Sequence, residues 1–352
     1  MTDLQKYFQE ISGKDVSGEI GKFNNPQEIK NFLESVKNAS VTSVSEGASK
    51  TCSVYNGYAI LKSKEVYKKP HREKFADYDL CRFSEWLISK GVITPKLYSL
   101  FYADKHYFEV FENVEGSQLS VTSTDVILKG AFGPDYSGPG PLGYTYEEKV
   151  LMGNFIYNYN KRAQEAILKL PDCAFDKLLE NYKFMSEIGF AFMDTNPGNV
   201  IVTNNEFKII DIEYRQTLTN FIERLEILTG KKCTISDVFK KLETNPKIFN
   251  VLGGFDPQKL KEDLCENFVF AFCSSCWYKK FLNSTQIADL MERDVKVLKR
   301  VVDTLSRAGL DFDLEKSKPQ ADLLEALGGD YGKYMEVVES QIKLYNQKKT
   351  MR

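Results

Sequence analysis

The segment of residues 189–213, GFAFMDTNPGNVIVTNNEFKIIDIE, constrains the fold of this chain more than any other segment. A Pro-Gly pair interrupts it, and two short apolar runs flank an Asn-Asn turn, which together predict a loop followed by a β-hairpin. Asp194 and Asn199 lie in the loop, and Asp211 lies at the end of the second strand. We therefore expect the hairpin to bring these three side chains together.

These three side chains have the chemistry that phosphoryl transfer needs. Magnesium ions on nucleotide phosphates prefer oxygen ligands, which Asn199 and Asp211 would supply. Asp194 is of the type that accepts a proton from an attacking hydroxyl. The same residue types also occur in turns without any chemistry, but the order of helix, loop, hairpin and terminal Asp favours the catalytic interpretation.

The pattern resembles the protein-kinase-like superfamily, whose catalytic loop reads H-R-D-x-x-x-x-N and whose metal loop reads D-F-G. Residues 194–199 keep D-x-x-x-x-N, Phe192 stands in place of the His, and D-I-E from Asp211 replaces D-F-G. The form D-x-x-P-G-N followed by I-I-D-x-E is closer to aminoglycoside- and choline-kinase-like relatives. The resemblance implies ATP and Mg²⁺ or Mn²⁺ as cofactors, and transfer of the γ-phosphoryl group to a hydroxyl.

The resemblance also implies a fold and a division into domains. We expect an α+β, two-lobed kinase-like fold with a small antiparallel-sheet lobe, a larger helical lobe and ATP between them. Residues 1–38 would form an N-terminal helical extension and residues 39–116 the small lobe. Residues 117–352 would form the large lobe, with a long insert at 117–145 and a helical C-terminal extension.

Strands are predicted at 41–47, 50–57 and 58–64, with turns between them. By resemblance, the loop that contains Gly47 and Ser49 would cover the phosphates of ATP. Lys62 would contact the nucleotide, because it shares one strand face with Ile60 in the family's Ala-x-Lys pattern. Lys64 lies on the same face and stays an alternative, as does a merely solvated Lys62.

A helix is predicted at 72–90, ending at a glycine. Kinases use an acid of this helix to pair the strand lysine, and Asp79 fits best by its position. Glu73 and Glu85 remain alternatives for that pairing.

Two further strands, at 96–102 and 106–111, lead into E-N-V-E-G, which ends at Gly116. This resembles the hinge of kinases, where backbone groups of an extended segment pair with the adenine ring. The resemblance assigns these contacts to Glu112 and Val114.

The Gly/Pro-rich residues 129–144 predict a surface loop, because such a composition disfavours helix and central strand. Apolar periodicity predicts helices on both sides of the hairpin and to the end of the chain. The expected helices span 146–170, 175–188, 217–228, 235–242, 260–281, 285–308, 321–327 and 331–348. A helix that starts so soon after Asp211 leaves no room for the activation segment of ordinary protein kinases.

A run of basic residues separates the lysine strand from its helix. Such a run is usually a solvated loop, but it also fits an anion site beside the ATP cleft. Its occupant would be a polyanionic activator such as an inositol phosphate or a phosphorylated partner. The residues are Lys64, Lys68, Lys69, Arg72 and Lys74.

Composition narrows the functional classes further. The net charge of -2 over 352 residues gives no general attraction to nucleic acid. The polar N-terminus lacks the pattern of a Sec-type signal peptide, and the longest apolar run is too short for a transmembrane segment. Seven cysteines, with one C-x-x-C at Cys273 and Cys276, predict reduced thiols in a cytoplasm, its own or that of a host cell.

Three functional classes fit these observations. The Gly/Pro loop and the terminal extensions favour a divergent Ser/Thr protein kinase of the bacterial-effector type, acting on a protein substrate. The form D-x-x-P-G-N and the absent activation segment favour a small-molecule kinase, acting on a small hydroxyl-bearing molecule. A pseudokinase or a nucleotidyl transferase on the same fold is the third alternative.

Overall fold

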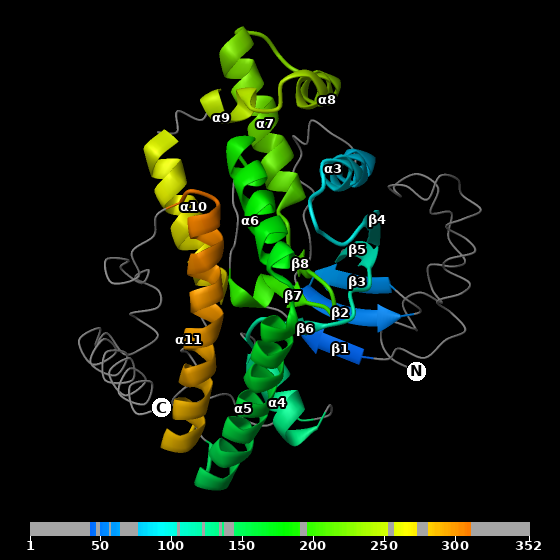
Figure 1. Ribbon diagram of the computed structural model, residues 1–352. Coiled ribbons are helices and arrows are strands. Elements are labelled where there is room, and N and C mark those ends of the chain that lie inside the picture. Colours follow the sequence, from blue (N-terminus) through cyan, green and yellow to red (C-terminus); the bar gives the residue numbers. More distant parts are fainter. Residues whose placement is uncertain are drawn as a thin grey trace. The chain divides into compact units, whose positions relative to one another are not determined.

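The computed structural model describes residues 43–46, 50–55, 58–63, 77–103, 106–121, 124–133, 136, 144–190, 196–252, 257–272 and 281–310. The described elements are helices and two small antiparallel sheets, as expected of an α+β protein (Figure 1). The chain forms two compact units. The first contains Met1–Glu115, Asn181–Asp194 and Lys208–Pro257, and the second contains Gly116–Glu180, Thr195–Phe207 and Gln258–Arg352.

A five-stranded antiparallel sheet belongs to the first unit. Its strand order is β1-β2-β3-β5-β4, so neighbours along the chain pair as hairpins except where β5 lies between β3 and β4. The five predicted strands are confirmed in the described residues, to within a few residues at their ends. They are β1 (Ser43–Glu46), β2 (Lys50–Tyr55), β3 (Tyr58–Ser63), β4 (Leu97–Ala103) and β5 (His106–Glu112).

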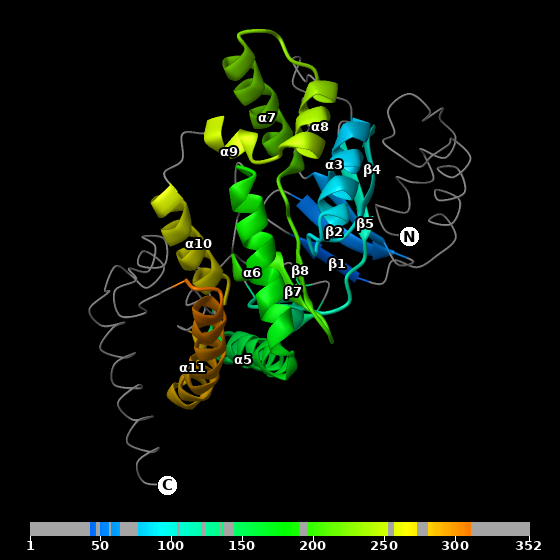
Figure 2. The same ribbon diagram turned by 45° about the horizontal axis from the view of Figure 1, so that its top comes forward.

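The helix α3 (Asp77–Ser89) lies beside β4 and supplies the centre of the first unit's core (Figure 2). The hydroxyl of Ser84 accepts the N–H of Leu97 at 3.2 Å, which fixes the start of the strand against the helix. Phe83 is fully buried and contacts four other aromatic rings. These rings are Trp86, Phe190, Tyr214 and Phe221.

Three helices after the hairpin complete the first unit. They are α7 (Tyr214–Thr229), α8 (Ile235–Thr244) and α9 (Ile248–Leu252). The first ends at Gly230, whose φ of 65° gives the left-handed C-terminal cap that glycine adopts without strain. A capping box of Thr234 and Asp237 then starts α8.

The other described helices lie wholly or partly in the second unit. They are α4 (Thr124–Phe132), α5 (Tyr146–Lys169), the first part of α6 (Asp172–Glu187), α10 (Pro257–Phe272) and α11 (Ser284–Arg307). Capping boxes begin α5 and α11, which explains where both start. No helix among the described residues is both long and apolar enough to span a membrane.

The prediction of a surface loop at 129–144 is wrong for its first four residues. Lys129 to Phe132 complete α4, and Gly133, with φ of 106°, ends it. Gly130 lies inside this helix. A Cβ at this position would come within 2.2 Å of the Phe155 ring on α5, so the close packing of the two helices requires a glycine. A glycine that composition assigns to a loop is therefore a close-packing position between two helices. Tyr144 is also buried rather than on the surface. Residues 134, 135 and 137–143 lie outside the described residues.

A second small sheet has the order β6-β7-β8, from β6 (Ser117–Gln118), β7 (Val200–Val202) and β8 (Phe207–Ile209). The predicted hairpin is confirmed, and its turn is closed by a 2.9 Å bond from the N–H of Thr203 to the carbonyl of Glu206.

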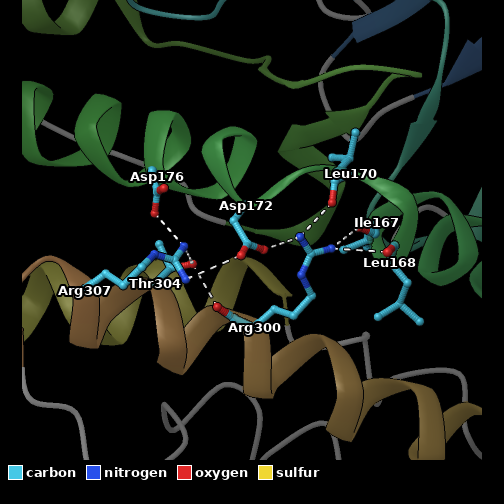
Figure 3. Close-up of polar contacts among 8 residues, drawn as sticks. All are labelled: Ile167, Leu168, Leu170, Asp172, Asp176, Arg300, Thr304 and Arg307. Atoms are coloured by element: carbon cyan, nitrogen blue, oxygen red, sulfur yellow. Dashed lines mark hydrogen bonds and ion pairs between the residues drawn. The ribbon is translucent and has the colours of Figure 1, made fainter.

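One arginine of α11 joins three helices of the second unit (Figure 3). The guanidinium of Arg300 donates to the carbonyls of Ile167, Leu168 and Leu170 at 3.2, 3.3 and 2.6 Å, where α5 ends. It also donates to the carboxylate of Asp172 at the start of α6, and this bond lowers the pKa of that carboxylate. Arg300 thus supplies donors to carbonyls at the C-terminal end of α5, where the hydrogen-bond pattern of the helix interior stops.

We expect Arg300→Ala to lower the free energy of unfolding by about 2–3 kcal/mol, because several charge-assisted hydrogen bonds to a helix end are lost together. Urea denaturation followed by circular dichroism measures this change. The matched control is Lys299→Ala, which removes the exposed neighbouring cation and should change the stability by less than about 0.5 kcal/mol. Equal stability of the two variants would contradict the role given to Arg300.

Candidate functional site

Asp211 has the most unusual backbone of the site. Its φ is 56°, and it is the single non-glycine residue with positive φ among the described residues. The left-handed conformation costs a side chain about 1 kcal/mol, less for Asp and Asn than for other residues. Such strain persists only where the surroundings enforce it, and it occurs often at functional sites. The carboxylate is 49% exposed, so it can accept a ligand.

Two contacts hold the backbone on either side of Asp211. Before it, the N–H of Ile209 donates to the carbonyl of Ile93 at 2.8 Å. After it, the hydroxyl of Tyr214 lies 3.4 Å from that of Thr94. Burial raises the pKa of Tyr214, so this hydroxyl stays neutral at physiological pH and can donate. The strained residue therefore lies between two fixed points on the segment that precedes β4.

Asn181 fixes that segment in turn. Its side-chain oxygen accepts the N–H of Ile93, and its side-chain nitrogen donates to the carbonyl of Gly91 at 3.2 Å. The residue is only 6% exposed. A buried amide that satisfies one donor and one acceptor of the same segment holds it in one conformation. The sequence carried a signal for this residue, because Asn181 interrupts the apolar stripe of the predicted helix three residues after Leu178.

Lys50, at the start of β2, is the cation nearest to Asp211 among the described ion pairs. Its ammonium donates to Glu109 at 2.9 Å and lies 4.0 Å from the carboxylate of Asp211. Burial, the largest single effect, lowers the pKa of Lys50. The charge and hydrogen bond of Glu109, with the charges of Asp211 and Glu213, together outweigh burial and raise that pKa. Sequence analysis selected neither Lys50 nor Glu109.

The expected nucleotide lysine, Lys62, lies on the other face of the same sheet. Lys50 is opposite Ser63 in the β2–β3 register, whereas Lys62 is opposite Thr51. Side chains alternate along a strand, so Lys62 shares its face with the fully buried Ile60. Asp79, the acid expected to pair with it, is buried on α3. The roles assigned to Lys62 and Asp79 stay predictions.

The expected hinge is an extended segment with available backbone groups. Glu112 ends β5 and exchanges two bonds with Lys96, since its N–H donates to the carbonyl of Lys96 and its carboxylate accepts the N–H of Lys96. Val114 follows outside the strand. In the described part of the chain, neither its N–H nor its carbonyl has a hydrogen-bond partner.

The glycine that ends this segment also has a structural reason. A Cβ at Gly116 would come within 2.3 Å of the carbonyl oxygen of Val202. Only glycine therefore allows the chain to enter the second unit so close to β7.

In the second unit, Asn199 ends a short 3₁₀ turn, Pro197–Asn199. The side chain of Asn196 caps this turn at Gly198, whose carbonyl accepts a bond from Gln118 at 2.8 Å. The turn thus holds the half-buried Asn199 at the start of β7. Its partnership with Asp211 at a metal ion stays a prediction.

The remaining expected site residues lie outside the described residues. They are Asp194, Gly47, Ser49, Lys64, Lys68, Lys69, Arg72 and Lys74. Cys273 and Cys276 lie outside as well, and the five cysteines in the described part form no disulfide with one another.

Comparisons with known proteins give little beyond this geometry. No protein-family model and no curated protein matches the chain. Among the solved structures that match is a crystal structure of a thermostable mutant of the aminoglycoside phosphotransferase APH(4)-Ia in its apo form. It is 10% identical, covers 78% of this chain and 97% of its own, and has a TM-score of 0.23. A likeness at that score carries no argument about fold or function.

We expect Asn181→Ala to lower the free energy of unfolding by about 2–3 kcal/mol, because it leaves a buried N–H and a carbonyl without their partner. The amides of Ile93 and Ile209 should also exchange faster with solvent, which hydrogen-exchange mass spectrometry measures. Glu180→Ala, at the exposed neighbouring position, is the control. Unchanged exchange at Ile209 in Asn181→Ala would show that the hydrogen bonds of Asn181 do not hold the hairpin in place.

Proposed function

We propose that this protein is an ATP- and metal-dependent phosphotransferase that transfers the γ-phosphoryl group to a hydroxyl. The observation that carries the proposal is the placement of Asp211. Asp211 follows the hairpin strand β8 by two residues, has a strained backbone, and places a half-exposed carboxylate beside a lysine of the five-stranded sheet. This pair of charges suits a magnesium-bound nucleotide, because the carboxylate of Asp211 would bind the metal and the neighbouring lysine would attract the phosphates.

The residues present fit a metal-bound nucleotide. The charges of Glu109, Asp211 and Glu213 all act on Lys50, so negative charge exceeds positive charge among these four groups. Such an excess favours a divalent cation at Asp211. No group of three or more His, Cys, Asp or Glu forms a metal site among the described residues. When bound, Mg²⁺ or Mn²⁺ neutralises charge on the phosphates.

The hinge fits adenine binding. Val114 presents an N–H and a carbonyl without partners in the described part of the chain, on the extended segment that follows β5. An adenine ring offers one donor and one acceptor on the same edge. Val114, with the carbonyl of Glu112, would thus bind the base. Asn199 would be the second metal ligand and Asp194 the base that accepts the hydroxyl proton.

We favour a divergent Ser/Thr protein kinase of the bacterial-effector type. The connection after Asp211 supports a kinase that works without an activation segment, since α7 begins at Tyr214. The same short connection supports a small-molecule kinase equally well, and this is the second candidate. Transfer of labelled phosphate from ATP to cell lysate proteins, in parallel with a panel of hydroxyl-bearing metabolites, separates them. Incorporation into protein alone supports the first candidate, and incorporation into metabolites alone supports the second.

The variant Asp211→Asn should abolish the Mg²⁺ dependence of ATP affinity while leaving the fold intact. Asn tolerates the left-handed conformation as well as Asp does, so charge is the main difference. Calorimetric titration of ATP with and without Mg²⁺ measures the effect. The control Glu223→Gln removes an exposed carboxylate of the same unit and should keep that dependence. An Asp211→Asn variant with the metal dependence of the parent would remove Asp211 from the proposed site.

Asp194→Ala should leave ATP affinity near that of the parent and lower the transfer rate by a factor of about 10² to 10⁴, as expected for loss of a positioned base. The initial rate of phosphate transfer at saturating ATP is the measurement. Transfer at the parent rate would mean that Asp194 is a loop residue without a chemical role.

A further inference from the structure

We propose that Lys50 on β2 is the lysine that contacts the nucleotide phosphates, and that Glu109 on β5 is the acid that positions it. This inference rests on the proposed function and names residues that the sequence pattern did not select. It follows from one juxtaposition. Lys50 lies between Glu109, at 2.9 Å, and Asp211, at 4.0 Å.

The sheet itself builds this pair. Cys52 on β2 is opposite Leu61 on β3, and Leu61 is opposite Glu109 on β5, so the three share one face. Lys50 precedes Cys52 by two residues and therefore lies on the same face. Its side chain reaches diagonally across β3 to the carboxylate. Three hydrogen-bonded strands thus fix both members of the pair.

Partial burial keeps Lys50 and Glu109 paired. The Glu109 side chain is 18% exposed and the Lys50 side chain 31%. A mostly buried carboxylate without a cation would be strongly unfavourable, so Glu109 holds the ammonium in place. Lys50 is thereby prevented from extending freely into solvent, as a surface lysine does.

Lys50 keeps donors for a ligand. An ammonium has three N–H donors, and in the described part of the chain only the bond to Glu109 occupies one of them. Asp211, at 4.0 Å, is beyond hydrogen-bond distance. A fixed cation with unused donors, beside the proposed metal-binding carboxylate, is suited to contact a phosphate oxygen.

With Lys50 and Glu109 as the pair, the pairing expected between Lys62 and Asp79 on α3 would not be needed to position the phosphate-binding lysine. Neither Lys50 nor Glu109 belongs to α3, so their ion pair does not depend on how that helix is held. An activator bound at residues 64–74 would consequently have to act on something other than this pair.

The test compares ATP with adenosine, because only ATP carries phosphates. We expect Lys50→Met to weaken ATP binding about 10- to 100-fold, the loss of a charge-assisted contact, and to change adenosine affinity less than about 2-fold. Lys50→Arg should recover part of the ATP affinity. Glu109→Gln should weaken ATP binding in the same selective way but by less, because the ammonium remains and only its position is lost. Calorimetric titration of each ligand in Mg²⁺ gives these values.

Two lysine variants complete the design. Lys232→Met removes an exposed lysine of the same unit and should bind both ligands as the parent does. Lys62→Met separates the two assignments. A selective loss of ATP affinity there, with ATP affinity retained in Lys50→Met, would overturn the inference in favour of Lys62.

The remaining outcomes are also decisive. Equal weakening of ATP and adenosine by Lys50→Met would mean a structural role for Lys50 and would overturn the inference. If Lys50→Met does not fold, Lys50→Arg and Glu109→Gln carry the same comparison, and unchanged ATP affinity in both would overturn it. A parent protein that binds neither ligand would contradict the proposed function itself, which distinguishes that failure from a failure of the Lys50 assignment.

Discussion

The first unit depends on the buried amide of Asn181. It holds the Gly91–Ile93 segment by a donor and an acceptor at once. Ile93 then accepts the N–H of Ile209, which leads directly to Asp211. A strained carboxylate needs such a chain of fixed points, because the backbone would otherwise relax to an ordinary conformation. The two hydrogen bonds of Asn181 thus link the packing of α6 to the geometry of the candidate site.

The sheet contributes the second requirement, a cation that is partly buried and still charged. A lone lysine at this position would lose its proton more easily, because burial disfavours the charged form. Glu109 and the neighbouring carboxylates reverse this effect and raise the pKa of Lys50. The charge is therefore fully present at neutral pH and would be lost only as the pH rises through that raised pKa.

In the second unit, ordinary secondary structure holds the turn at Pro197–Asn199. Asn196 caps the turn that contains Pro197 and Gly198, and Gln118 of β6 donates to the carbonyl of Gly198. Gly116 is required by the close approach of the chain to Val202. The segment that resembles a kinase hinge therefore ends beside β7, the strand that begins directly after Asn199.

The sequence by itself determined the local elements. Period-two alternation and turn residues predicted the five strands and the hairpin, because these signals act over a few residues. Helical periodicity predicted seven of the described helices but not α4 or α9, and the helices expected at 321–327 and 331–348 lie outside the described residues. It also placed Asp211 at the end of a strand. Which of two strand faces meets Asp211 is a property of packing, so the sequence pointed to Lys62 while the structure brings Lys50 there.

Only the tertiary structure could decide the contacts between distant residues. Asn181 reaches segments about ninety residues away in the chain, and no short-range pattern specifies such a partner. Gly130 belongs to a Gly/Pro-rich segment that is typical of a loop, but in the structure it makes room for the Phe155 ring inside a helix. The physical reason is the same in each case. Propensity acts between neighbours in sequence, whereas burial, charge and close packing act between neighbours in space.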